Sequence, residues 1–185
     1  MAKFKGKYRI ESIRAQWWDY GWNGAYFITI CTKNRKHFFG EIRNGKMVLS
    51  PVGVIADILW NEIPNHSQFV SLGEFVVMPN HIHGILLIDT PAPTVATVDP
   101  GHALDLPPSI PPGETRFQNI GKNTISSIVG SYKSAVTRHA NRLEIENGWQ
   151  AGFHDHIIRN HAEYDRIENY IIKNPKNWRG DKFNN

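Results

Sequence analysis

The chain has 185 residues, of which 41% are hydrophobic and 11% aromatic, and its formal net charge is +4. This length and composition predict one folded domain with a sizeable core and exclude a disordered chain. A single cysteine, Cys31, excludes an intrachain disulfide framework and a zinc site built from cysteines. The sequence has no run of about 20 apolar residues and no apolar signal-peptide core at its start. We therefore expect a cytoplasmic protein with no membrane partner.

Charge is distributed unevenly along the chain. Residues 1–50 contain ten Lys and Arg against three Asp and Glu, and residues 116–185 contain eleven against seven. The segment between them, residues 51–115, contains seven acids and no Lys or Arg. Two basic segments that flank an acidic one can fold into one positive face, which would suit a polyanion such as nucleic acid. Many basic proteins bind no such partner, so charge alone leaves both alternatives open.

The N-terminal part predicts an arm followed by strands. Residues 1–24 combine basic side chains with tryptophans and predict an ordered arm, and residues 25–185 predict a single domain. Aromatic and β-branched residues predict a strand at 25–33. Within residues 38–49, Asn44-Gly45 predicts the turn of a hairpin.

A helix and a strand pair are predicted next. Ser50-Pro51 predicts the start of a helix, with Ser as N-cap and Pro at the first helical position, and apolar residues recur at helical spacing as far as Ile63. Two apolar runs, residues 68–78 and 81–88, are joined by Pro79-Asn80 and predict an antiparallel pair.

The remainder of the chain predicts a loop, two helices and a strand. Residues 90–115 hold seven of the eleven prolines and no periodic pattern, which predicts a long loop or insertion. Helical patterns occupy residues 124–143 and 160–173, the second ended by Pro175, and residues 149–158 predict a short loop and strand. The order of elements predicts an α+β fold with a mainly antiparallel sheet.

His81-Ile82-His83 is the first candidate site. Side chains alternate along a strand, so His81 and His83 point to the same face, about 6–7 Å apart, where two imidazoles can converge on a divalent ion. The alternative is a pair of surface histidines on an edge strand. The position of the pair, between a sharp turn and a wholly apolar run, favours the metal site.

His154-Asp155-His156 has the same spacing and adds a carboxylate. It is a second candidate metal site on spacing alone, and the alternative is a solvated loop. The neighbouring Arg159 favours phosphate or backbone contacts over a metal.

Tyr170 and Asn174 are neighbours on one face of the last predicted helix. Periodicity alone favours Tyr170 as a core residue beside Ile167 and Ile171, with its hydroxyl bonded to a neighbour. The functional alternative is a nucleophile whose proton is lost near a metal or a cation, with the Asn174 amide oxygen offered to the same metal. Tyr164 is a rival, but it lies out of phase with the isoleucine stripe.

Several short motifs occur in an order that is similar to a known family. The two most specific are Met78-Pro79-Asn80-His81-Ile82-His83 and Tyr170-Ile171-Ile172-Lys173-Asn174-Pro175, accompanied by Tyr26-Phe27-Ile28-Thr29, Trp149-Gln150 and His156-Ile157-Ile158-Arg159-Asn160. Over roughly residues 25–178, apart from 90–115, the chain resembles the REP-associated tyrosine transposases of the single-tyrosine HUH transposase superfamily. The HUH element (His, hydrophobic, His) matches residues 81–83.

The resemblance implies a ferredoxin-like antiparallel sheet with helices on one face, and metal-dependent cleavage and transfer of single-stranded or hairpin DNA. Tyr170 would attack a phosphodiester and leave a 5′-phosphotyrosine and a free 3′-OH. His81 and His83 would bind Mg²⁺ or Mn²⁺, with Asn174 as third ligand where insertion-sequence relatives usually have Gln. Whether a second copy of the chain completes the site, in a homodimer, is left open.

Basic side chains of the two flanking segments are the candidate DNA contacts: Lys3, Lys5, Lys7, Arg9, Arg14, Lys33, Arg35, Lys36, Lys133 and Arg159. The tryptophan-containing arm and the long Pro-rich stretch depart from the family pattern. Two alternatives remain open. One is a catalytically inactive or domesticated DNA-binding protein of the same fold, and the other is a metal-dependent hydrolase, for which the sequence lacks an evident general base beside His81.

Overall fold

The computed structural model describes residues 23–91, 124–181, 183 and 184. The expected arm at 1–24 and the Pro-rich loop at 90–115 lie almost wholly outside these residues, so both stay predictions. Within the described ranges no helix combines the length and the apolar character needed to cross a bilayer.

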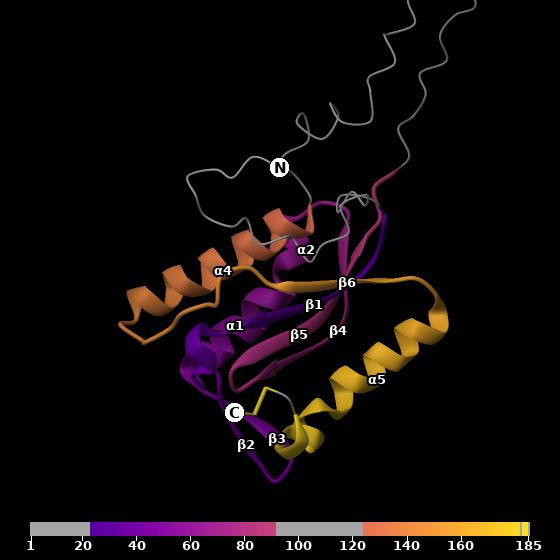
Figure 1. The fold of residues 1–185 in the computed structure, drawn as a ribbon. Coiled ribbons are helices and arrows are strands. Elements are labelled where there is room, and N and C mark those ends of the chain that lie inside the picture. Colours follow the sequence, from indigo (N-terminus) through magenta and orange to yellow (C-terminus); the bar gives the residue numbers. More distant parts are fainter. Residues whose placement is uncertain (1–22, 92–123, 182, 185) are drawn as a thin grey trace, which may run out of the picture.

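A four-stranded antiparallel sheet forms the centre of the fold. Its strands are β1 (Gly24–Cys31), β4 (Val70–Met78), β5 (His81–Ile88) and β6 (His154–Ile158), in the order β4-β5-β1-β6. Helix α1 (Pro51–Asn61) connects β1 to β4, and α4 (Ile125–Arg142) lies between β5 and β6 in the chain. This βαββαβ order confirms the predicted α+β, ferredoxin-like fold (Figure 1).

The predicted hairpin forms a separate two-stranded sheet from β2 (Gly40–Arg43) and β3 (Lys46–Leu49). Asn44 and Gly45 both have positive φ, 51° and 72°, as a two-residue Asn-Gly turn requires. A short 3₁₀ turn, η2 (Lys33–Arg35), links β1 to this hairpin.

The first predicted helix is interrupted. The Ser50 hydroxyl accepts from the Gly53 N–H at 3.1 Å, as expected of an N-cap. Helix α1 nevertheless ends at Asn61, and a short helix, α2 (Ile63–His66), follows it. Pro64 is the reason, because it has no N–H to donate to the Trp60 carbonyl and so cannot continue the helix.

The last helix is longer than predicted. Asn160 caps α5 (His161–Asn177) by accepting from the Glu163 N–H at 2.9 Å. Pro175 lies inside the helix instead of ending it, and a 3₁₀ turn, η3 (Trp178–Gly180), follows. The prediction was wrong because a proline so close to the C-terminus removes only one backbone hydrogen bond, the one to Ile171.

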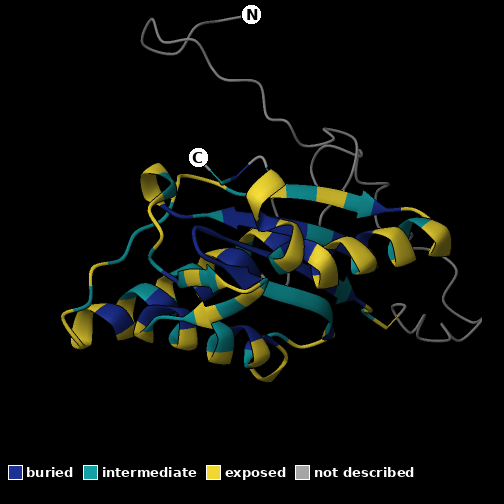
Figure 2. Cartoon of the chain, turned by 90° about the horizontal axis from the view of Figure 1, so that it is seen from below, coloured by how far each residue is buried: buried dark blue, intermediate teal, exposed yellow. Residues whose placement is uncertain are grey.

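Helices cover both faces of the sheet, whereas the resemblance implied helices on one face only. Helices α1 and α4 pack on the face that carries Ile82 and Leu86, and α5 packs on the opposite face, which carries Ile85 (Figure 1). Strand β5 is buried along almost its whole length and is therefore covered on both sides. Figure 2 shows buried central strands beneath helices whose outer sides are exposed.

Gly84 on β5 leaves room for the Trp60 side chain of α1. A Cβ atom there would lie closer than 3.0 Å to the buried Trp60 indole. We expect Gly84→Ala to lower the free energy of unfolding by about 1–3 kcal/mol in urea denaturation, through overpacking. Gly130→Ala is the matched control, because no atom lies within 4 Å of its Cβ position, and it should be neutral or stabilising. Equal losses in the two variants would contradict this packing.

Candidate active site

The two histidines of the HUH motif lie side by side beneath α5. His81 and His83 begin β5, between β4 and β1, and are 0% and 1% exposed. Their ring centroids are 4.4 Å apart, so the predicted common face is confirmed. The alternative of two surface histidines on an edge strand is wrong, because β5 is a central strand.

Hydrogen bonds from neighbouring residues orient both rings. His83 Nδ1 lies 2.8 Å from the buried Thr29 hydroxyl, directly across on β1. His81 Nδ1 lies 2.8 Å from Asn80 Oδ1, and the Asn80 amide nitrogen donates to the Phe183 carbonyl at 2.7 Å. That donation makes Asn80 Oδ1 the acceptor, so His81 carries its proton on Nδ1 and its lone pair on Nε2. Such bonds to the second nitrogen are what metal-binding histidines commonly make.

Tyr170 reaches the histidine pair from α5. Its hydroxyl lies 3.1 Å from His83 Nε2, while Ile167 and Ile171 on the same helix are buried against the sheet. The Tyr170 side chain is 39% exposed. Interpreting Tyr170 as a core residue is therefore wrong, and the hydroxyl is placed between an imidazole and solvent.

The surroundings of Tyr170 keep its hydroxyl protonated. Partial burial raises the pKa of Tyr170 above its ordinary value, and the negative charge of Asp181 raises it further. The Asn174 side chain, one turn along α5, acts in the opposite direction. The phenol therefore needs a base or a cation before it can act as a nucleophile.

Asn174 is buried beside Tyr170 and held by Asp181. It is 1% exposed, and its amide nitrogen donates to Asp181 Oδ2 at 3.2 Å. Its Oδ1 atom is buried and accepts no hydrogen bond from the residues that the structure describes. Tyr170, Asn174 and Asp181 line one cavity of about 400 Å³ together with Asn177 and Gly180.

These residues fit the metal ligands implied by the resemblance. A buried amide oxygen without a donor is unfavourable alone, and a cation would satisfy it. The described residues contain no cluster of three His, Cys, Asp or Glu side chains suited to a metal. Two imidazoles and one amide oxygen would therefore hold a hard cation weakly.

The C-terminal residues complete the site in a way that the sequence did not indicate. Phe183 packs on His81, with ring centroids 4.5 Å apart. The Arg35 guanidinium lies over the Phe183 ring, 4.7 Å from its centroid. Arg35 has the left-handed backbone conformation, with φ of 54°, which is uncommon for a side chain without a local hydrogen-bonding group. Among the predicted DNA contacts that the structure describes, Arg35 is thus the one that reaches the aromatic ring packed on His81.

The other predicted DNA contacts occupy different positions. Lys36 pairs with Glu146 at 2.7 Å, and Lys133 donates to the Gln150 and Gly152 carbonyls. Lys33 is exposed in η2, and Arg159 is exposed where β6 meets α5. Lys3, Lys5, Lys7, Arg9 and Arg14 lie outside the described residues.

The second histidine pair does not form a comparable site. His154 and His156 are exposed on β6, at the edge of the sheet. His156 Nε2 lies 2.8 Å from the Glu163 carboxylate, and Glu163 also accepts the Arg159 N–H. Glu163 is therefore committed to stabilising the start of α5, and this pair belongs to no three-ligand cluster in the described part of the chain.

The chain has a close relative in Haemophilus influenzae. That uncharacterised protein is 36% identical over 179 residues, which cover 96% of this chain and 94% of the relative. The two chains belong to one family. No family model matches the sequence.

One solved structure confirms the predicted fold. A REP-associated tyrosine transposase, solved bound to a REP hairpin, aligns over 91% of this chain and 74% of its own length, with a TM-score of 0.57 and 16% identity. A transposase candidate from Deinococcus radiodurans R1 covers 93% of this chain and 96% of its own, also at 16% identity, but its TM-score of 0.43 is too low to support an argument. The fold is thus shared with a REP-associated tyrosine transposase.

The hydroxyl of Thr29 is expected to be essential to the orientation of His83. Thr29→Val keeps the shape of the side chain but removes this hydrogen bond inside the sheet. We expect the free energy of unfolding in urea to fall by about 1–3 kcal/mol. Thr29→Ser keeps the hydroxyl and should cost less. A loss as large in the serine variant would show that the hydrogen bond is not the cause.

Proposed function

We propose that this protein is a metal-dependent enzyme that cleaves single-stranded or hairpin DNA and transfers the strand through a covalent bond to Tyr170. The observation that carries the proposal is the Tyr170 hydroxyl, partly exposed and 3.1 Å from His83 in the HUH motif.

In this reaction the scissile phosphate is transferred from the 3′ oxygen of one nucleotide to the hydroxyl oxygen of Tyr170. Tyr170 Oη forms a bond to phosphorus while the bond from phosphorus to the 3′ oxygen breaks, which leaves a 5′-phosphotyrosine and a free 3′-OH. The phenol loses a proton and the departing 3′ oxygen gains one. A 3′-OH can reverse the step and rejoin the strand without ATP, because the ester to tyrosine conserves the phosphodiester.

A positive charge near the histidines suits a phosphate. Arg35 lies over the Phe183 ring, which in turn packs on His81. Asp181, by contrast, accepts from the Asn174 amide and from the Phe183 N–H at 2.7 Å. Because both its oxygens are engaged, Asp181 is poorly placed as the base of a hydrolase, and phosphoryl transfer to Tyr170 is favoured over that alternative.

We assign His81, His83 and Asn174 as the residues that would hold Mg²⁺ or Mn²⁺. When bound, such an ion would withdraw negative charge from the scissile phosphate. His83 Nε2 has one lone pair, so it cannot accept from Tyr170 and ligate a cation at the same time. Tyr170 must therefore leave His83 when the site is loaded, and its partial exposure allows it to turn toward the DNA.

Tyr170→Phe should abolish covalent attachment to DNA, because the attacking oxygen is missing. The measurement is a denaturing gel of protein incubated with a 3′-labelled hairpin oligonucleotide and Mn²⁺, because the fragment that stays on the tyrosine keeps the original 3′ end. Tyr164→Phe is the matched control: it lies on the same helix and should form the adduct as the wild type does.

An adduct that survives Tyr170→Phe would contradict the assignment of the nucleophile. A wild type that binds hairpin DNA but yields no adduct on any hairpin tested would instead favour the non-catalytic DNA-binding protein.

The ligand assignment can be tested without DNA by titrating Mn²⁺ and following the electron paramagnetic resonance signal of the unbound ion. His81→Gln or His83→Gln should weaken Mn²⁺ binding more than about tenfold. Tyr170→Phe should bind Mn²⁺ at least as tightly as the wild type, because the phenol no longer competes for His83 Nε2. His154→Gln, exposed on the edge strand, should change nothing. Unchanged affinity in both His81→Gln and His83→Gln would refute the site.

A further inference from the structure

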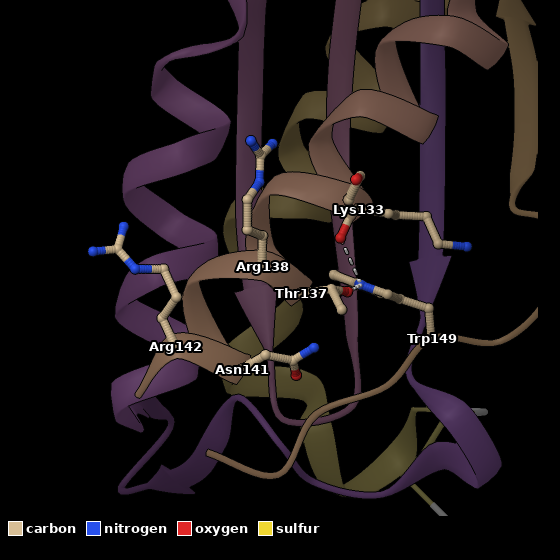
Figure 3. Close-up of a pocket in the computed structure, with 7 residues that line it drawn as sticks. Lys133, Thr137, Arg138, Asn141, Arg142 and Trp149 are labelled. Atoms are coloured by element: carbon tan, nitrogen blue, oxygen red, sulfur yellow. Dashed lines mark hydrogen bonds between the residues drawn. The ribbon is translucent and has the colours of Figure 1, made fainter. Parts of the chain in front are cut away.

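A second hollow lies on α4, across the sheet from Tyr170. It has a volume of about 730 Å³ and is lined by one side of α4 and by Trp149 (Figure 3). Lys133, Arg138 and Arg142 contribute its three cations, and Thr137 and Asn141 lie between them. Figure 3 shows that Arg138 and Arg142 extend from the helix in different directions, away from Trp149.

No acid in the described residues neutralises the positive charge of this hollow. Helix α4 contains no Asp or Glu in its 18 residues. Arg138 and Arg142 are exposed and form no ion pair or hydrogen bond with any residue in 23–91, 124–181, 183 or 184. Among nearby acids, Glu146 is paired with Lys36, and Glu144 lies beyond the end of the helix. Two unpaired guanidinium groups one helical turn apart are typical of a surface that meets an anionic partner.

Trp149 forms the rigid floor of the hollow and offers little surface for stacking. Its indole N–H lies 3.2 Å from the Lys133 carbonyl and 3.1 Å from the Thr137 hydroxyl. Phe39 and Tyr132 pack against its ring, and the Lys133 ammonium lies 5.8 Å from the ring centroid. Proteins that bind unpaired strands use aromatic faces on which bases stack. A surface with cations but no such face suits the backbone of a duplex instead.

The hollow and the candidate active site lie at the same end of the sheet, although on opposite faces. Trp149 forms a β-bridge with Thr32, and the Thr32 N–H donates to the Asn80 carbonyl at 2.9 Å, next to His81. Lys33 follows Thr32 directly, and Lys33 and Arg35 both belong to the turn η2 at the end of β1. A positive path therefore leads from α4 around the end of β1 to Tyr170.

We propose that the α4 hollow binds the sugar–phosphate backbone of duplex DNA through Arg138 and Arg142, and that the strand leaving this duplex passes Lys33 and Arg35 to reach Tyr170. The proposal rests on the proposed function only in taking DNA as the partner. The two arginines are one helical turn apart, about 6 Å along the helix axis, so both can meet phosphates of one duplex. Recognition of this kind is independent of sequence.

The test is fluorescence anisotropy with a labelled 20-base-pair duplex and with a single strand of the same sequence, at several salt concentrations. Replacing both arginines, Arg138→Gln with Arg142→Gln, should weaken duplex binding about tenfold or more at low salt and reduce the salt slope by roughly two. The loss should be the same for a second, unrelated duplex and smaller for the single strand.

The matched control removes the same charge elsewhere, with Arg43→Gln and Lys46→Gln on the exposed hairpin. This pair should leave duplex affinity close to that of the wild type. Equal weakening by the two pairs would overturn the proposal in favour of net charge. Unchanged affinity in the α4 variant, or a larger loss for the single strand, would also overturn it.

The adduct assay on the wild type separates this proposal from the proposed function. Duplex binding through α4 without any adduct would leave the α4 surface standing and remove the strand-transfer function. An adduct in the wild type, with no binding defect in the α4 variant, would remove the α4 surface alone.

Discussion

Two imidazoles buried at the start of a central strand are the constraint on which the rest of the site depends. A buried polar ring costs free energy unless its nitrogens are bonded, and here the partners come from three parts of the chain. Thr29 on β1 and Asn80 in the preceding turn each hold an Nδ1 atom, and Tyr170 on α5 reaches His83 Nε2. Strand pairing, the turn before β5 and the position of α5 must all be correct for the histidines to be tolerated, so the site is part of the core.

The two faces of the sheet have different tasks. On one face α1 and α4 build the large core with Trp60 and Tyr132, which anchors the fold. On the other, α5 covers a smaller cluster around Ile85 and leaves the half-exposed Tyr170 beside the histidines. The segment after α5 closes this side through Asp181 and Phe183. One helix thus provides packing through its isoleucines and chemistry through Tyr170 and Asn174, which lie on neighbouring positions of its surface.

The cations that line the α4 hollow and those that follow β1 lie at one end of the sheet. The uneven charge along the sequence predicted a single positive face, but α4 must bury its apolar side on the sheet face opposite α5. Its cations therefore lie across the sheet from Tyr170, and they approach the site only around the end of β1, where Thr32 joins Trp149 to Asn80. Duplex DNA would then bind on the α4 face of the sheet, and the strand would be cleaved at Tyr170 on the opposite face.

The sequence by itself determined the elements and the motif residues. Period-two and helical patterns located most strands and helices, and Asn44-Gly45 located the hairpin turn, because these signals are local. Spacing placed His81 and His83 on one face, but periodicity alone favoured a core Tyr170, and only the resemblance to a known family indicated roles for Tyr170 and Asn174. The end of α5 was missed, since the effect of Pro175 depends on how many backbone bonds follow it.

Only the tertiary structure decided which distant residues join the site and which side chains are buried. Thr29, Asp181 and Phe183 carry no local signal for their roles, and Arg35 becomes part of the site only because Phe183 packs between it and His81. Burial likewise separated His81 and His83 from the equally spaced His154 and His156. The physical reason is that pairing β5 between β1 and β4 fixes neighbours across the sheet, which spacing along one chain does not specify.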